Sequence, residues 1–472
     1  MDEFILKAIE RVPLAEAVLL LWRWATTPER LQSIWDRNRG RCYDKVIEFP
    51  VMVNLISDAL LICESGRESF QKNIENGTLE ASIQAAYKKL GRIPVAVSEA
   101  FLLNTTSALR EAFPDWAQWK SPSSLRNLQV VIFDGKALKK VAKRLKRLRG
   151  VPGGLLGGRA LVAIDWETGL AIAMRGDLDG DSNEVKHVKD LVPQVGRELP
   201  SPKLYVSDRA FCDLEQPRHF TAAEGDHFLV RYHPKVKFHV DSSVRERRGT
   251  NNDDQQYVET WGYLGSERDP RRRNVRRIEL MRPDKEPVIL ITDLLDPKRY
   301  PATDLLWIYR ERWEIERLFQ QVTEVFGLSH LIGTTPQATL FQFSFCMVLY
   351  NMVQVIRGYI AQVQDRQPSD ISTELMFRDV ARQMSAWHFL ITPEQTQSYF
   401  MDHPALGRIQ RRLRHLLRTT WSDSWLASPP QSIHRTTAKR RARTHGSVYR
   451  ILFGPPPKKR RTNLAKKRCL QQ

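Results

Sequence analysis

Three carboxylates in the middle of the sequence have the chemistry and the spacing to bind divalent cations. Asp134 and Asp208 each follow a short apolar run, LQVVIF and KLYVS, where a strand is expected to end. A strand end lifts a carboxylate to the edge of a sheet, where it can meet a cation without being buried unpaired. Glu316 lies in LLWIYRERWEIERLFQQV, and helical geometry places it within about 60° of Tyr309 and Arg312. A helix packed on that sheet would bring Glu316 over both strand ends.

The chemistry expected of these acids is phosphodiester cleavage. Three converging carboxylates repel one another unless cations lie between them, and carboxylate oxygens are hard ligands that select Mg²⁺ or Mn²⁺. Two such ions about 3.5–4 Å apart activate an attacking hydroxyl and stabilise the leaving oxygen of a phosphodiester. The three acids therefore predict a site for two divalent ions.

Each acid taken singly also has an ordinary structural explanation. An Asp–Gly pair after a strand commonly forms a turn, and Glu314 or Glu316 could pair with Arg310 or Arg317 on a solvated helix face. Asp165 also follows an apolar run, but it opens DWETG, which is typical of a hairpin turn. The joint placement of the three acids, together with a basic C-terminus, favours the catalytic interpretation.

The elements expected around these acids form a mixed α/β core with helical regions before and after it. Apolar residues recur every three or four positions before residue 125, whereas short β-branched runs follow. In the helix-like DGDSNEVKHVKDLVPQV, Asp181 and Glu184 are spaced as a capping box. The predicted units are a helical N-terminal region that is a candidate for DNA binding (1–125), the first half of the core (126–221), a β-rich insertion (222–300), the second half of the core (301–360), a helical C-terminal region (361–430) and a basic tail (431–472).

The positive charge of the 472-residue chain is concentrated at its C-terminus. The formal net charge is +19, and residues 403–472 contain eighteen Lys and Arg against one acid, Asp423, a net +17. Subtracting +17 from +19 leaves +2 for the first 402 residues. A polycation of this kind suits nucleic-acid phosphates, because binding releases condensed counterions. A solvated tail and an anionic membrane surface are the alternatives, but aromatic residues interleave with the charges and no long amphipathic helix supports a membrane.

Cysteine usage and hydropathy favour a reducing, aqueous compartment. The five cysteines are scattered and odd in number, and no pair has metal-ligand spacing. The N-terminus does not resemble a signal peptide, and the longest apolar runs fall short of the roughly 20 residues that span a bilayer. We therefore expect a cytoplasmic protein with no membrane partner.

The segment YRERWEIERLF resembles the signature of DDE transposases of the insertion-sequence-4 family. Tyr309, Arg312 and Glu316 match its tyrosine, arginine and glutamate at the family's spacing. IFDGKAL and YVSDRAF resemble the segments that carry the family's two aspartates, Asp134 and Asp208. The resemblance covers roughly residues 125–350. It departs from the pattern at Thr323, where the family has a lysine.

The resemblance implies a fold and an activity. The fold is an RNase H-like α/β mixed sheet interrupted by a β-rich insertion, in which Asp134, Asp208 and Glu316 bind two Mg²⁺ or Mn²⁺ ions. The activity is cut-and-paste transposition: DNA is nicked at terminal inverted repeats, and the freed 3′-hydroxyl is joined to target DNA by transesterification. A synaptic homodimer in a prokaryotic cytoplasm, associated with the nucleoid when bound to DNA, is also implied.

The resemblance also assigns residues to DNA. Tyr309 and Arg312 would contact phosphate at the transposon end, where Thr323 removes one positive charge. Trp261, in YVETWGYLG, is a candidate for stacking on a flipped base in a hairpin intermediate, but a tryptophan in the core or on the sheet surface is the favoured explanation.

A basic cluster in the tail has two explanations. PPPKKRR contains Lys458, Lys459, Arg460 and Arg461, and it resembles a nuclear import signal. In a prokaryotic enzyme, phosphate binding accounts for it better.

Two rival functions remain open. The first is a nuclease on the same core that hydrolyses DNA without strand transfer, and the second is a DNA-binding relic, which Thr323 favours. Two motif-like stretches are set aside. GDLDGD lacks the glycine and the final acid of a calcium loop, and GGLLGGR lacks the Lys–Ser/Thr of a phosphate loop.

Overall fold

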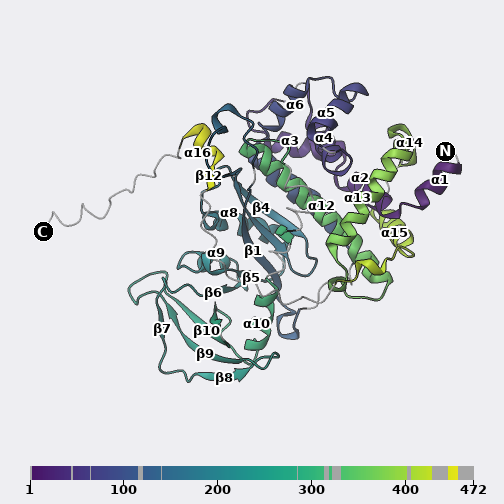
Figure 1. Cartoon of the computed structure of the whole chain (residues 1–472). Helices are drawn as coiled ribbons and strands as arrows, with labels where there is room; N and C mark the ends of the chain where they lie inside the picture. The colour runs from purple at the N-terminus through teal and green to yellow at the C-terminus, as the bar shows by residue number, and fades with distance from the viewer. Residues whose placement is uncertain are drawn as a thin grey trace.

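The computed structural model (Figure 1) describes residues 3–43, 46–63, 65–114, 121–139, 141–283, 285–312, 318–320, 331–400, 405–427 and 445–454. The N-terminal region is helical, as expected. Serine or threonine side chains cap α3, α5 and α6, each accepting a hydrogen bond from a first-turn amide that would otherwise lack a partner. The helices are α1 (Glu3–Glu10), α2 (Pro13–Ala25), α3 (Pro28–Asn38), α4 (Phe49–Leu61), α5 (Gly66–Glu75), α6 (Ile83–Leu90) and α7 (Val95–Ala112).

The core sheet has the strand order of an RNase H-like fold. Its order is β4-β3-β1-β5-β6, with β3 antiparallel to both neighbours and β1, β5 and β6 mutually parallel. The β3–β4 hairpin turns at DWETG, where buried Asp165 accepts from Thr168 Oγ1 at 2.7 Å. The strands are β1 (Gln129–Ala137), β3 (Arg159–Asp165), β4 (Ala171–Asp177), β5 (Lys203–Ser207) and β6 (His227–Arg231). The expected α/β class is therefore confirmed.

The insertion extends this sheet without a break. Strand β11 pairs with β6 and continues the sheet through β10 and β9 to β7, while β8 also pairs with β9, so that ten of the described strands form one sheet. In Figure 1 the insertion strands project away from the helical regions. They are β7 (Phe238–Val240), β8 (Arg247–Thr250), β9 (Gln256–Leu264), β10 (Arg273–Arg282) and β11 (Lys285–Thr292). The predicted insertion range begins before β6, which the structure pairs with the core strand β5.

Helices cover the core sheet. Helix α9 (Gln216–Phe220) places Phe220 against Phe133 of β1 and Tyr205 of β5, next to α8 (Val188–Glu198). Helix α10 (Ala302–Glu311) follows the insertion, and α12 (Pro336–Val363) packs on α7 and β4. Of the residues described, only α12 forms a helix long and apolar enough to cross a membrane, and its most apolar window is completely buried inside the protein.

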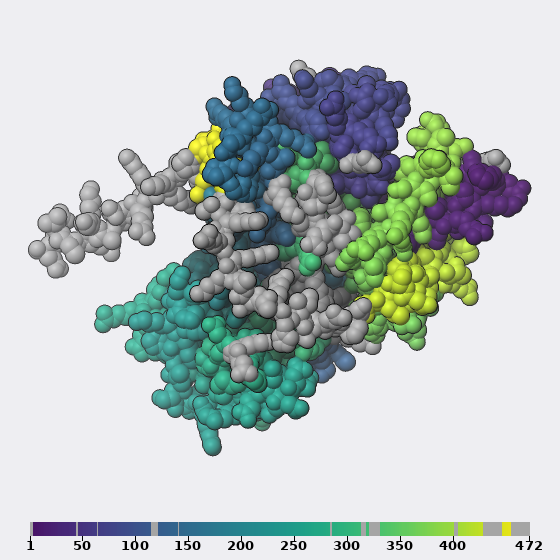
Figure 2. Space-filling view, in the orientation of Figure 1, coloured from purple at the N-terminus to yellow at the C-terminus, as the bar shows by residue number. Residues whose placement is uncertain are grey.

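The helices after α12 pack against the N-terminal region. Helices α13 (Thr373–Leu390) and α15 (Leu406–Leu417) both contact α2, and α14 (Pro393–Tyr399) lies between them in sequence. Buried Glu16 accepts hydrogen bonds from Arg412 Nε at 2.7 Å and from the Tyr399 hydroxyl at 3.0 Å. The two helical regions predicted at opposite ends of the chain therefore form one helical body, visible on the same side of Figure 2.

Part of the predicted basic tail forms regular structure on the core. Strand β12 (His445–Ser447) pairs in parallel with β2 (Gly154–Leu156), and α16 (Val448–Phe453) follows. In Figure 2, α16 lies against the segment that precedes β2. The remaining short elements are the 3₁₀ turns η1 (Ser123–Leu125), η2 (Lys146–Leu148), η3 (Glu184–His187), η4 (Arg209–Phe211), η5 (Pro368–Asp370) and η6 (Asp423–Trp425).

The capping box expected at Asp181 and Glu184 is wrong. Asn183 caps η3 by accepting from the amide of Val185 at 3.1 Å, and α8 begins only after that turn. Glu184 instead pairs with Arg159 of β3. The ion pair with Arg159 engages the Glu184 side chain that a capping box would require.

Candidate catalytic site

Two of the predicted acids lie side by side at one edge of the sheet. Strands β1 and β5 are parallel, and Phe133 is in register with Ser207. Asp134 and Asp208 are the next residues on each strand, so both point to the face opposite Phe133, about 4.8 Å apart in the backbone. The same register places Arg231, at the end of β6, next to Asp208. Asp134 within β1, Asp208 directly after β5 and Arg231 at the end of β6 therefore occupy neighbouring positions in a row.

Local hydrogen bonds fix the orientation of both carboxylates. Asp134 Oδ1 accepts from the amide of Gly135 at 2.8 Å, and the Asp134 side chain is 17% exposed. Asp208 caps η4, with Oδ1 accepting from the amide of Ala210 at 2.7 Å. The bond to Asp208 lies in the turn after β5, whereas the bond to Asp134 lies within β1. The expectation that the first strand ends at Asp134 is wrong, because pairing with β3 continues β1 to Ala137.

The signature tyrosine and arginine lie over these acids. Arg312 Nη1 is 3.6 Å from Asp134 Oδ2, and its guanidinium carbon is 5.6 Å from the centre of the Tyr309 ring. Both side chains are buried. Burial raises the pKa of the Tyr309 phenol, and the Asp208 carboxylate adds to the rise, whereas Arg312 and Arg231 oppose it. Tyr309 is therefore within electrostatic reach of Asp208, and Arg312 contacts Asp134.

Glu316 lies outside the described residues, and so do Thr323, Lys458, Lys459, Arg460 and Arg461. The described positions on either side of Glu316 both contact β1. Arg312, four residues before it, pairs with Asp134, and Phe319, three residues after it, accepts at its carbonyl a hydrogen bond of 3.3 Å from Lys136 Nζ. Lys136 is two residues beyond Asp134 and shares its face of the strand.

Trp261 holds the chain that leads from the insertion into α10. It lies on β9, opposite Arg276 of β10, and its indole N–H donates to the carbonyl of Leu295 at 2.9 Å. Arg276 is fully buried, pairs with Glu259, and donates to the carbonyl of Tyr300 at 2.6 Å. Both side chains therefore support the segment that positions Tyr309 and Arg312.

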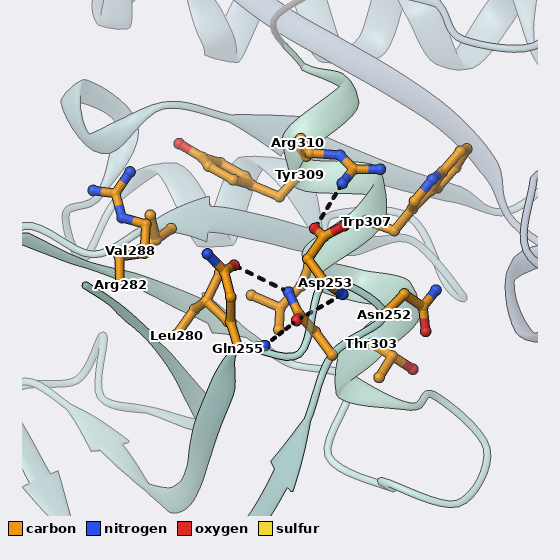
Figure 3. Close-up of a pocket in the computed structure, with 12 residues that line it drawn as sticks. Asn252, Asp253, Gln255, Leu280, Arg282, Val288, Thr303, Trp307, Tyr309 and Arg310 are labelled. Carbon is orange, nitrogen blue, oxygen red and sulfur yellow. Dashed lines mark hydrogen bonds and ion pairs between the residues drawn. The ribbon is translucent and has the colours of Figure 1, made fainter. Parts of the chain in front are cut away.

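A pocket beside Tyr309 was not anticipated from the sequence. It has a volume of about 190 Å³ and lies between α10 and the turn at 251–255 (Figure 3). Arg310 Nη1 reaches across to Asp253 Oδ2 at 2.9 Å. The polar run NNDDQQ was the available signal, but only the fold places it against α10. The lining residues are Asn251, Asn252, Asp253, Gln255, Leu280, Arg282, Val288, Thr303, Leu306, Trp307, Tyr309 and Arg310.

The two aspartates suit a hard divalent cation. Their carboxylate oxygens are the ligand type that Mg²⁺ and Mn²⁺ prefer, at a strand edge that needs no burial of an unpaired charge. Within the described residues, no group of three or more His, Cys, Asp or Glu is arranged to hold a metal. A complete three-acid site therefore requires a ligand from outside the described residues.

The structure is an RNase H-like α/β sheet in which Asp134 lies on β1 and Asp208 directly follows the neighbouring strand β5. Residues 127–352, a little less than half of the chain, match the family model described as the transposase DDE domain. This match supports transposase function and suggests nuclease or transposition activity.

Two further comparisons add little. A search of curated proteins found no match. A solved structure described as a piggyBac transposase synaptic complex with hairpin DNA aligns over 87% of this chain and 78% of that one, with 10% identity and a TM-score of 0.36. That likeness is too distant to bear on the function.

Proposed function

We propose that the chain is a DNA transposase that moves an insertion sequence by a cut-and-paste mechanism. Asp134, Asp208 and Glu316 hold two divalent ions, Mg²⁺ or Mn²⁺. The observation that carries the proposal is the in-register pair Asp134 and Asp208 directly beneath Tyr309 and Arg312. Such an arrangement presents two metal-binding carboxylates and two phosphate-binding side chains at a single point.

The residues divide the chemistry between them. When bound, the two ions activate the attacking hydroxyl and stabilise the leaving oxygen. Arg312 and Tyr309 orient the scissile phosphate, because a guanidinium and a phenol donate to phosphate oxygens in fixed directions. Arg231 and Lys136 flank the two acids and add positive charge where DNA must enter.

The partners of this site are the inverted repeats at the transposon ends and the target DNA, held by a homodimer in the synaptic complex. Lys458, Lys459, Arg460 and Arg461 contribute phosphate contacts through the basic tail. Trp261 remains a candidate for base stacking, although its indole N–H already donates to Leu295.

Substitution of Asp208 tests the site. Asp208→Asn keeps the cap on η4 but removes the charge, so we expect Mg²⁺-dependent nicking of a plasmid carrying the gene and its flanking DNA to fall below detection. DNA affinity should stay within a few fold. Asp213→Asn is the matched control. Asp213, five residues after Asp208, accepts the same kind of capping hydrogen bond from the amide of Glu215, and the variant should nick normally. Normal nicking by Asp208→Asn would remove this residue from the site.

Strand transfer distinguishes the rival functions. Pre-cleaved transposon ends are incubated with the protein, Mg²⁺ and a supercoiled target plasmid, and joined products are scored by gel electrophoresis. A transposase makes joined product, whereas a nuclease on the same core makes only nicks. Binding with neither product would identify a relic.

A further inference from the structure

Helix α15 exposes arginines that have no acid beside them. Residues 403–422 contain five arginines and no Asp or Glu. Arg412 pairs with Glu16. The other four are exposed, and within the part of the chain that the structure describes none of them forms an ion pair. We call these four the arginine row: Arg408, Arg411, Arg414 and Arg418.

The opposite side of α15 is fixed in the helical body. Ile409, Leu413 and Leu417 are 1% exposed or less, and the helix packs on α2, α7 and α12. Arg412 Nε adds a hydrogen bond of 2.7 Å to Glu16 of α2. At about 100° per residue, the arginine row covers an arc of about 120°, roughly opposite these buried side chains. Packing therefore holds the row toward solvent, where Figure 2 shows this segment in yellow-green.

The helix dipole does not account for the arginine row. Arg414 and Arg418 lie at the C-terminal end of α15, where positive charge interacts favourably with the dipole. Arg408 and Arg411 lie in the first two turns, where positive charge is unfavourable, and the first turn contains no acid. Half of the row therefore lies where it weakens the helix that carries it.

The exposed arginines of α13, a helix that also packs on α2, are balanced by acids. Arg378 pairs with Glu374 one turn before it, and Arg382 Nη1 lies 3.0 Å from Asp379 Oδ1. Pairs three or four residues apart are a common way to balance charge on a solvated helix face. Because α15 lacks such pairs among the described residues, its arginine row is available to an anionic ligand.

DNA is a polyanion whose charge spacing fits the arginine row. Arg408 and Arg418 are ten residues apart, so the row is about 15 Å long. A duplex carries one phosphate per roughly 1.7 Å of its axis, so a segment of that length presents about nine. A guanidinium can donate two parallel hydrogen bonds to one phosphate. An anionic membrane fits less well, because the buried apolar side of α15 cannot enter a bilayer.

We propose that the arginine row binds the phosphate backbone of double-stranded DNA, in addition to the contacts at the catalytic site. This inference rests on the proposed function, which supplies DNA as the polyanion. The helical body holds the four side chains on one rigid helix, so less conformational freedom is lost on binding than in an unstructured basic segment. Phosphate contacts carry no base information, so the row binds duplexes of any sequence.

Charge removal tests the arginine row. Arg408→Gln with Arg411→Gln removes two charges that the helix dipole disfavours, and glutamine is a good helix former, so the urea midpoint should not fall. With about 0.9 per phosphate contact, the slope of log affinity against log salt should become shallower by about 1.8. Arg414→Gln with Arg418→Gln should have the same effect. Fluorescence anisotropy of a labelled duplex of random sequence in EDTA measures the slope, and an unchanged slope would overturn the proposal.

Matched variants separate phosphate contacts from net charge. Arg378→Gln with Arg382→Gln removes two charges from α13 and should leave the slope unchanged, because these arginines are paired with acids. Arg408→Lys with Arg411→Lys retains the charge of the row and should keep the wild-type slope. An equally shallow slope in the α13 variant would show that net charge alone is responsible, and would overturn the proposal.

Binding in EDTA needs no catalysis, so its result is separate from that of nicking. A shallower slope for Arg408→Gln with Arg411→Gln, in a protein whose wild type neither nicks nor joins DNA, would retain the arginine row and reject the transposase. Normal nicking with an unchanged slope would reject the row alone. Sedimentation with phosphatidylserine vesicles tests the membrane alternative. Loss of vesicle binding by the same variant, without a change in the DNA slope, would overturn the proposal.

Discussion

In the proposed function, Arg312 is the residue at which the metal ligands and the DNA-phosphate contacts meet. Its guanidinium lies 3.6 Å from Asp134 Oδ2, so it neutralises the carboxylate that a divalent ion must also use. The Arg312 guanidinium and a divalent ion bound at Asp134 would repel each other by a few kcal/mol at an effective dielectric constant of about 20. Until DNA phosphate binds, Arg312 therefore competes with a divalent ion for the Asp134 carboxylate.

This competition predicts two opposite effects of Arg312→Gln. The Mg²⁺ concentration for half-maximal nicking should fall several-fold, because the repulsion is gone. The maximal rate should fall at least tenfold, because a donor to the phosphate is lost. Titration of nicking with Mg²⁺ measures both. Arg310→Gln, whose partner Asp253 lies in the neighbouring pocket, should leave the Mg²⁺ midpoint unchanged. An unchanged midpoint in Arg312→Gln would contradict the competition.

At the scale of single residues, the sequence singled out the two aspartates but not the basic side chains beside them. Asp134 and Asp208 are readable because each ends an apolar run, and the sheet then places them in register. Arg231 and Lys136 give no such signal, since their role depends on which strands pair. Glu316 lies outside the described residues, so its convergence with the aspartates stays a prediction.

Among the elements, β9 and β10 of the insertion determine where α10 begins. Buried Arg276 on β10 binds Glu259 on β9 and the carbonyl of Tyr300, two residues before α10 starts. Desolvation lowers the pKa of Arg276, and the Glu259 carboxylate opposes that shift. The pair thus ties the insertion sheet to the start of the helix that carries Tyr309.

Removing one partner of this pair should be costly. Arg276→Ala leaves Glu259 buried without its cation, and we expect a loss of about 3–5 kcal/mol in the free energy of unfolding. Arg277→Ala is the matched control, because Arg277 pairs with Glu279 on the more exposed side of the same strand and should lose about 1 kcal/mol or less. Urea denaturation of both variants measures the difference. Similar losses would show that the buried pair has no special role.

Strand periodicity and breaker residues predicted most elements, and local capping signals were less reliable. The β3–β4 hairpin follows from two apolar runs around DWETG, as the structure confirms. The capping box failed because Glu184 pairs with Arg159, a residue 25 positions away. Local spacing cannot reveal such a competing partner before the sheet is known.

Across the whole molecule, positive charge is concentrated in the C-terminal region. Seven Lys and Arg lie after Gly454, so deleting residues 455–472 removes up to seven phosphate contacts. At about 0.9 per contact, the slope of log affinity against log salt should become shallower by up to roughly six. Fluorescence anisotropy of a labelled duplex at several salt concentrations measures this slope. A full-length variant with these seven residues changed to glutamine should behave like the deletion. An unaltered slope would show that this part of the tail does not bind phosphate.

Long-range assembly was the least predictable feature. The sequence assigns helices to both ends of the chain, but nothing in it pairs Glu16 with Arg412. The C-terminal segment Ser447–Phe453 is a similar case. Its Arg450 binds Asp179 and Asp181 of GDLDGD, a stretch that the sequence alone marks only as an incomplete calcium loop. Composition predicted a uniform basic tail, and the described part of it instead carries a segment complementary to the core.

Strand β6 joins the core sheet to the insertion through the backbone hydrogen bonds of its two edges. One edge of β6 pairs with β5, which ends at Asp208, and the other edge pairs with β11 of the insertion. A displacement of the insertion sheet would therefore pass through the backbone hydrogen bonds of this single strand to the end of β5, next to Asp208.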